Sequence, residues 1–223
     1  MKHPTIIGAG GVASYLLPVL IKSFHPHSLT IVDKDKLEER NLDRQMFSSA
    51  HIGRNKAIAL ASQCCNCDLP VNIIEEWFDE LTELPEDTDL IICVADNHLA
   101  RKDALIQADK RNVPAVIGGN EYLDNEAYYY RPEWKGTTKD PRVRHPEILT
   151  AGDTGSPTAC TGLAQEASPQ LAVANLGCAA KILHLLWVWE RFSFENHLTS
   201  EAIECLPYEL SSSLTDHTST VAA

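Results

Sequence analysis

Short apolar, β-branched runs alternate along the first half of the chain with longer stretches whose apolar residues recur at helical spacing. Five of the short runs predict strands: residues 5–7, 29–32, 73–74, 90–94 and 115–117. Three of the longer stretches predict helices: residues 12–23, 55–64 and 97–111. Strands that alternate with helices indicate an α/β fold with a doubly wound, mainly parallel sheet and helices on both faces.

The pattern changes after Gly119, and the second half predicts an antiparallel extension of the sheet. Residues 126–130 and 202–206 predict strands, and residues 167–189 predict a long helix with Pro169 in its first turn. Residues 135–160 are rich in Gly, Pro, Thr and charge without an apolar period, which predicts a long mobile loop of the crossover type.

Proline also sets expectations within the first predicted helix. Pro18 removes one hydrogen bond from the helical ladder, so we expect it to kink that helix or to end its first segment.

With 223 residues, the chain has the length of one large domain, which we place at residues 1–210. Residues 211–223 have the small, polar composition of a flexible tail.

Charge and cysteine content narrow the class of protein. The formal net charge of -12 disfavours nonspecific binding to nucleic acid or to an anionic membrane. Seven cysteines, an odd number, without an apolar signal at the start indicate reduced thiols and a cytoplasmic location. The most apolar stretch, residues 171–189, contains Asn175, Lys181 and His184, which favours a buried helix over a membrane span.

A glycine-rich turn follows the first predicted strand and precedes the first predicted helix. In Gly8-Ala9-Gly10-Gly11, backbone N–H groups and the positive end of the helix can meet a phosphate. Asp33, at the end of the second strand, is the residue type that accepts the hydroxyls of a ribose. Together they predict a Rossmann-like nucleotide site, although a plain tight turn is an alternative for the glycines alone.

The following segments make the pattern specific. Asp33 and Asp35 precede the sequence Asn41-Leu42-Asp43-Arg44-Gln45, which is followed by Ile52-Gly53-Arg54-Asn55-Lys56-Ala57. Asp96-Asn97 follows the fourth predicted strand, and Arg101 comes four residues later. In order and spacing these motifs resemble those of the ThiF/MoeB/HesA family, in the superfamily of ubiquitin-activating-enzyme-like adenylyltransferases. The resemblance is close over residues 5–131 and holds in outline beyond.

The resemblance implies a role for each matched residue. Arg44 and Lys56 would bind the phosphates of ATP, Asp96 would hold magnesium, and Asp33 would bind the ribose. Asn41 and Gln45 would position the phosphate end, and Gly8, Gly10, Gly11, Asp35 and Asn97 would complete the nucleotide site. Taken singly, Arg44 and Lys56 are equally consistent with solvated surface charges, and Asp96 with a helix cap.

The chain departs from the family pattern in two places. Ala13 stands where the last glycine of the phosphate turn is usual. A further phosphate-binding arginine usually lies upstream of the first strand, where this chain has only residues 1–4, so that arginine would come from a partner chain or from elsewhere. This favours a homo- or heterodimer, and it keeps a non-catalytic subunit open as an alternative.

The cysteines offer one candidate nucleophile. Cys160 lies between the predicted loop and the long helix, where thioester-forming relatives carry theirs, although simple packing explains a small free cysteine equally well. Cys64, Cys65 and Cys67 lack the spacing of a zinc site, so we expect no zinc. Cys93 and Cys178 are expected to be inert core residues.

The sequence therefore predicts an enzyme that uses ATP and magnesium. Its expected reaction is adenylation of the C-terminal carboxylate of a small ubiquitin-like or sulfur-carrier protein with a Gly-Gly tail, with possible transfer to Cys160. The alternatives are a nucleotide-binding subunit without catalysis and an NAD-dependent oxidoreductase. The oxidoreductase accounts for the glycines and Asp33 but not for the other motifs.

Overall fold

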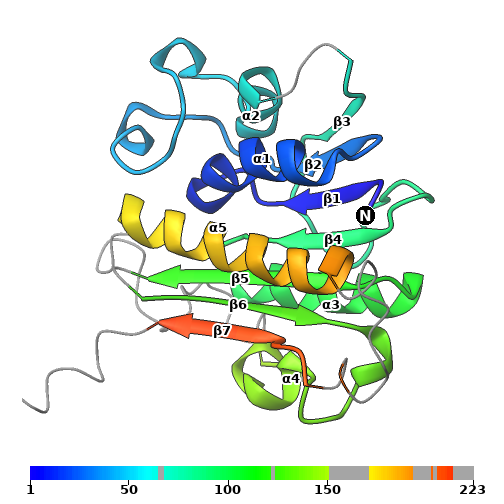
Figure 1. The fold of residues 1–223 in the computed structure, drawn as a ribbon. Helices are drawn as coiled ribbons and strands as arrows, with labels where there is room; N and C mark the ends of the chain where they lie inside the picture. Colours follow the sequence, from blue (N-terminus) through cyan, green and yellow to red (C-terminus); the bar gives the residue numbers. More distant parts are fainter. Residues whose placement is uncertain (65–67, 122–123, 151–170, 193–201, 203–204, 213–223) are drawn as a thin grey trace, which may run out of the picture.

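The computed structural model describes residues 1–64, 68–121, 124–150, 171–192, 202 and 205–212. Its centre is one seven-stranded sheet in the order β3-β2-β1-β4-β5-β6-β7 (Figure 1). The strands are β1 Pro4–Ile7, β2 Leu29–Val32, β3 Val71–Ile74, β4 Leu90–Cys93, β5 Ala115–Glu121, β6 Asp124–Tyr130 and β7 Glu209–Ser212. The first five strands run parallel, which confirms the predicted α/β fold.

Helices cover both faces of this sheet. The main helices are α1 Gly11–Phe24, α2 Lys56–Cys64, α3 His98–Arg111 and α5 Ala172–Leu186, and the last continues as a π-helical turn over Trp187–Phe192. Helices α1 and α5 lie side by side in front of the sheet in Figure 1, and α3 lies behind it. This is the doubly wound arrangement that the alternation of strands and helices predicts.

The central strands are buried along their whole length. Every residue of β1, β2 and β4 is buried, as expected for parallel strands that are covered on both faces and therefore lack polar alternation. Ile7 pairs with Val32 on one side and with Cys93 on the other, so these three strands end at one level. The chain order reverses between β1 and β4, and ligands of such sheets bind at the carboxyl ends beside that point.

Helix α1 differs from the prediction made for Pro18. The helix runs from Gly11 to Phe24 without interruption, so the expectation that Pro18 ends its first segment is wrong. Leu16, Leu17 and Leu20 are fully buried against the core. We attribute the continuity to this burial, because the apolar area on both sides of Pro18 outweighs the loss of one ladder hydrogen bond.

The second half of the sheet is antiparallel, as predicted, but its last strand lies elsewhere. β5 pairs with β6 as a hairpin, and β6 pairs with β7. The described residues of the strand expected at 202–206 are not extended: Ala202 is helical, Cys205 lies in a turn, and β7 begins at Glu209. Ser211 and Ser212, assigned to the tail, belong to β7, and residues 213–223 lie outside the described part of the chain.

Residues 135–150 are more regular than the loop predicted for 135–160. They contain helix α4, Pro141–Arg144, and a 3₁₀ turn at Pro146–Ile148. Asp140 accepts a hydrogen bond from the Arg142 backbone at 2.9 Å, and the Arg142 guanidinium contacts Asp109 of α3 at 2.8 Å. Ion pairs rather than an apolar face fix this segment, which explains why periodicity did not reveal it. Residues 151–160 are outside the described ranges.

The long apolar helix packs within the protein. Residues 172–191 have the length and composition of a membrane span, but 44% of the most apolar window is buried inside the fold. Helix α5 contacts α1, β5 and β6. This agrees with the expectation of a buried helix, although residues 167–170, its predicted beginning, lie outside the described residues.

Candidate functional site

The glycine turn lies at the carboxyl end of β1, between the ends of β2 and β4. Gly8 has a φ of +91°, and a Cβ at this position would lie 2.9 Å from the Ala95 backbone nitrogen. The Gly8 N–H donates to the Val32 carbonyl at 2.9 Å. Gly8 is therefore required by the close approach of the β4 end and by the handedness of the turn.

Asp33 ties the turn to the end of β2. Its carboxylate accepts hydrogen bonds from the Ala9 N–H at 2.6 Å and from the Asp35 N–H at 2.7 Å. Burial raises the pKa of Asp33, while these two hydrogen bonds and the charge of Lys56 oppose the rise. Each carboxylate oxygen retains acceptor capacity, so the expected bond to a ribose hydroxyl remains compatible with this geometry.

Lys56 is positioned by the start of α2. Asn55 donates from its side chain to the Asp33 carbonyl at 2.7 Å and accepts from the Ala57 N–H at 2.8 Å, so it links α2 to β2 while capping the helix. The Lys56 ammonium forms an ion pair with Asp35 at 3.1 Å, and its side chain is 13% exposed. A cation is thus held beside Asp33 at the edge of the nucleotide site.

The start of α1 offers backbone donors that the helix itself does not use. The helix has no side-chain cap at Gly10, so the N–H groups of its first turn have no intrahelical acceptor. Gln45 is buried, and its Oε1 has no hydrogen-bond partner among the described residues. Its Nε2 lies 3.9 Å from the position that a Cβ on Gly10 would occupy. The uncapped helix end and the Gln45 amide nitrogen that faces Gly10 both supply donors at one place, which fits an anion.

Arg44 lies on the segment that covers this turn. The segment begins with a 3₁₀ turn at Glu39–Asn41, in which the buried Asn41 accepts from the Glu38 N–H at 3.0 Å. The Arg44 guanidinium contacts the Arg40 carbonyl at 2.8 Å and Asp43 at 2.9 Å. Arg44 and Lys56 therefore form ion pairs with different carboxylates. Among the described residues, no contact between these two side chains is observed.

Asp96 and Asn97 follow β4 at the same edge of the sheet. Asp96 is exposed, and Asn97 caps α3 by accepting from the Ala100 N–H at 2.8 Å. The cap of α3 is Asn97, so the alternative that Asp96 is a helix cap is wrong. Among the described residues no three His, Cys, Asp or Glu side chains gather as a metal site. Magnesium is commonly held by one or two carboxylates together with substrate phosphates, and the single Asp96 carboxylate fits that mode.

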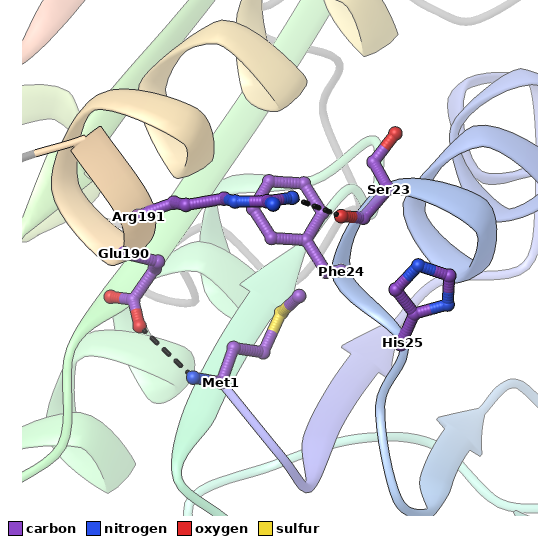
Figure 2. Close-up of a pocket in the computed structure, with 6 residues that line it drawn as sticks. All are labelled: Met1, Ser23, Phe24, His25, Glu190 and Arg191. Carbon is purple, nitrogen blue, oxygen red and sulfur yellow. Dashed lines mark hydrogen bonds and ion pairs between the residues drawn. The ribbon is translucent and has the colours of Figure 1, made fainter. Parts of the chain in front are cut away.

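A polar cavity of about 300 Å³ lies beside this edge. Its lining includes His98 at the start of α3, Asn120 at the end of β5 and Asn125 and Glu126 of β6. A second cavity, of about 260 Å³, lies at the opposite edge of the sheet, near the amino end of β1 (Figure 2). There Arg191 donates to the Ser23 carbonyl at 3.0 Å, far from the glycine turn. We therefore exclude the second cavity from the site.

Sequence reasoning missed a residue of α5 that reaches the turn. Asn175 is fully buried, and its side chain would overlap a Cβ on Gly11 at 2.3 Å. Its amide donates to the Arg44 carbonyl at 3.0 Å. The only signal in the sequence was a polar residue within an apolar helix. A second missed feature is Trp77, 62% exposed, whose ring lies 3.6 Å from the Lys34 ammonium next to Asp33.

Two of the cysteines behave as predicted. Burial raises the pKa of Cys93 to about 11 and that of Cys178 to about 12, so both thiols remain protonated in the core. Cys160, the candidate nucleophile, lies outside the described residues, as do Cys65 and Cys67.

Comparison with known proteins identifies relatives of this fold. The model of the ThiF family matches residues 2–200. The human protein named ubiquitin-like modifier-activating enzyme 7 is 36% identical over 89 residues, which cover 37% of this chain and 9% of that protein. This chain therefore spans a small part of that relative's length.

Three solved structures share the fold. E. coli MccB, solved with SeMet MccA, matches with a TM-score of 0.64 and 20% identity over 86% of this chain and 56% of its own. The structure of TcdA (CsdL) matches with a TM-score of 0.66 and 14% identity over 88% of both chains. E. coli MccB with ATP matches with a TM-score of 0.63 and 19% identity over 83% of this chain and 55% of its own.

Proposed function

Since the chain belongs to the ThiF family, we propose that it is an ATP-dependent adenylyltransferase that activates the C-terminal carboxylate of another protein. The observation that carries this proposal is the uncapped start of α1 beside Gln45, a buried residue whose amide nitrogen faces Gly10. Asp33 and Lys56 flank the same turn. Donors without acceptors, at the sheet edge where ligands bind, suit the phosphates of a nucleotide.

In the proposed reaction a carboxylate oxygen attacks the α-phosphorus of ATP. The bond between that phosphorus and the oxygen that bridges to the β-phosphorus breaks, and pyrophosphate leaves with the electron pair. Negative charge accumulates over the phosphates, where Lys56, Arg44 and the N–H groups of α1 would stabilise it. Gln45 and Asn41 would orient the phosphate end, Gly10 would leave room for it, and Asp33 would hold the ribose.

Magnesium belongs to this proposal through Asp96. The ion would neutralise charge on the triphosphate, and Asp96 would be its protein ligand at the carboxyl end of β4. Asn97 would keep Asp96 in place by fixing the first turn of α3.

The proposed acyl substrate is a small ubiquitin-like or sulfur-carrier protein with a Gly-Gly tail. The name of the human relative, a ubiquitin-like modifier-activating enzyme, supports a partner of this class. The structure of MccB together with MccA supports an acyl substrate that is a separate molecule. Transfer of the activated acyl group to Cys160 as a thioester is a further proposal, as are a dimeric state and a cytoplasmic location.

Pyrophosphate exchange tests the reaction. The chain is incubated with ATP, magnesium, labelled pyrophosphate and candidate carrier proteins that end in Gly-Gly. We expect label to enter ATP only when a carrier with a free C-terminal carboxylate is present, and the same carrier with an amidated C-terminus serves as the control. Asp96→Ala should abolish exchange, whereas Cys160→Ala should leave exchange intact and remove only a thioester. Absence of exchange with every carrier would contradict the proposal.

Adding a second subunit to the exchange assay distinguishes the non-catalytic alternative from the proposed enzyme. A silent subunit would bind ATP without exchange until its partner is supplied. A specific prediction of the third alternative, an oxidoreductase, is binding of NAD without binding of ATP. Lys56 beside Asp35, a cation at the edge of the nucleotide site, favours a triphosphate over that alternative.

A further inference from the structure

Asn175 joins two parts of the site that are distant in the sequence. It lies near the start of α5 and is fully buried. Its Nδ2 donates to the Arg44 carbonyl at 3.0 Å, and its Oδ1 accepts from the Asn120 side chain at 3.0 Å. The orientation of this amide follows from its partners, because a carbonyl can only accept and the amide nitrogen must therefore face Arg44.

Each neighbour of Asn175 borders a different part of the proposed site. Arg44 belongs to the segment that covers the glycine turn, and Asn120 lines the polar cavity beside β5 and β6. Gly11 opens α1, and a Cβ there would lie 2.3 Å from the Asn175 amide. The absence of a side chain at Gly11 thus makes room for Asn175, whereas the space at Gly10 remains open.

We propose that Asn175 is a positioning residue, which fixes the Arg44 segment and the start of α1 relative to the polar cavity where the acyl substrate would enter. This inference rests on the proposed adenylation. For attack on the α-phosphorus, the carboxylate must be aligned with the residues that bind the phosphates. Small displacements of such groups lower the reaction rate strongly. Asn175 touches no reacting atom and acts through Arg44, Gly11 and Asn120.

The first measurement is kinetic. Asn175→Ala removes both hydrogen bonds, and we expect kcat/KM for carrier-dependent exchange to fall by about tenfold to a hundredfold. Cys178→Ala, one turn further along α5 and equally buried, is the matched control and should retain the wild-type value. Asn120→Ala, which removes only the partner of Oδ1, should give an intermediate loss.

The second measurement separates positioning from folding. Gly11→Ala alone should destabilise the fold, because the added methyl group meets Asn175. In Gly11→Ala/Asn175→Ala the methyl group gains space, so the double variant should be more stable than the sum of the single effects predicts. Its exchange activity should nevertheless stay low, since the Arg44 anchor is still missing. A purely structural role predicts that activity returns with stability.

The third measurement does not depend on the reaction. The backbone amides of Arg44, Gln45, Met46 and Phe47 are all hydrogen-bonded, so hydrogen exchange reports how firmly this segment is held. In Asn175→Ala these amides should exchange at least about tenfold faster, with no change in Cys178→Ala. Unchanged protection would overturn the inference even if the wild-type protein adenylates a carrier. Faster exchange would support it even if no carrier is found, in which case only the proposed function fails.

Discussion

Gly8 and Gly53 share a left-handed backbone but differ in their surroundings. Gly8 has φ +91° and Gly53 has φ +84°; a Cβ on Gly8 would lie 2.9 Å from the Ala95 nitrogen, whereas no atom lies within 4 Å of one on Gly53. We expect Gly53→Ala to lower the free energy of unfolding by about 1 kcal/mol, from backbone strain alone. Gly8→Ala should cost about 3 kcal/mol or more, because β4 must also shift. Urea unfolding of both variants measures the difference, and equal losses would contradict the steric role of Gly8.

Lys56 and Lys110 form a second matched pair of residues. Lys56 contacts Asp35 at 3.1 Å. Lys110, which lies on α3 away from the glycine turn, contacts Glu80 at 3.0 Å. Lys56→Met should lower pyrophosphate exchange by about a hundredfold, since a cation near the phosphates is lost. Lys110→Met should leave the rate unchanged. Both should alter stability by less than about 1 kcal/mol, as is usual for surface ion pairs. Equal exchange rates would remove Lys56 from the site.

Some residues of the site could be predicted from the sequence, and others could not. The turn with Gly8, Asp33 and Lys56 is assembled from local motifs that follow strand ends, so the sequence order reveals it. Tertiary packing brings Asn175 to Gly11 and to Arg44. Asn175 lies 131 positions after Arg44 in the sequence. No local period encodes such a contact, and only its polarity within an apolar helix hinted at it.

Among the elements, α1 tolerates a proline at a measurable cost. Pro18 lies within α1, and the carbonyl of Ser14 lacks the ladder donor that another residue at position 18 would supply. Pro18→Ala should therefore raise the free energy of unfolding by about 1 kcal/mol or more. Chemical denaturation checks this. An unchanged or lowered value would mean that the packing of the proline ring contributes as much as the missing hydrogen bond.

Helix α3 carries a buried carboxylate that makes stability depend on pH. Burial, and then repulsion by Glu80, raises the pKa of Asp103 to about 6. The folded state therefore binds the proton more tightly than the unfolded state, and stability should increase as the pH falls from 7 through 6 toward about 4. Asp103→Asn should add about 1 kcal/mol at pH 7.5 and almost nothing at pH 4. An equal gain at both pH values would contradict this origin.

The accuracy of the element predictions follows the source of their stability. β1, β2 and β4 are apolar throughout and were recognised from that feature. Helix α4 was missed because Arg142 and its acidic partners hold it. The final strand was placed too early, since β7 has no buried residues and its position is set by pairing with β6.

For the whole molecule, one exposed apolar surface bears on assembly. Val173 and Leu176 of α5 and Trp187 of the π-helical turn that follows it are 58%, 53% and 42% exposed. We expect the chain to sediment as a dimer, with this surface at the interface. Val173→Glu/Leu176→Glu should then yield monomers, whereas Leu81→Glu, at a residue 78% exposed after β3, should not. A wild-type monomer at micromolar concentrations would contradict the expectation.

The bond between Asn175 and Arg44 also bears on how the protein is made. Asn175 is the 131st residue that a ribosome adds after Arg44. During that interval the emerging amino-terminal half can pair its parallel strands, yet the segment over the glycine turn lacks its anchor. Nascent chains should therefore acquire secondary structure early and nucleotide affinity only when α5 has left the exit tunnel.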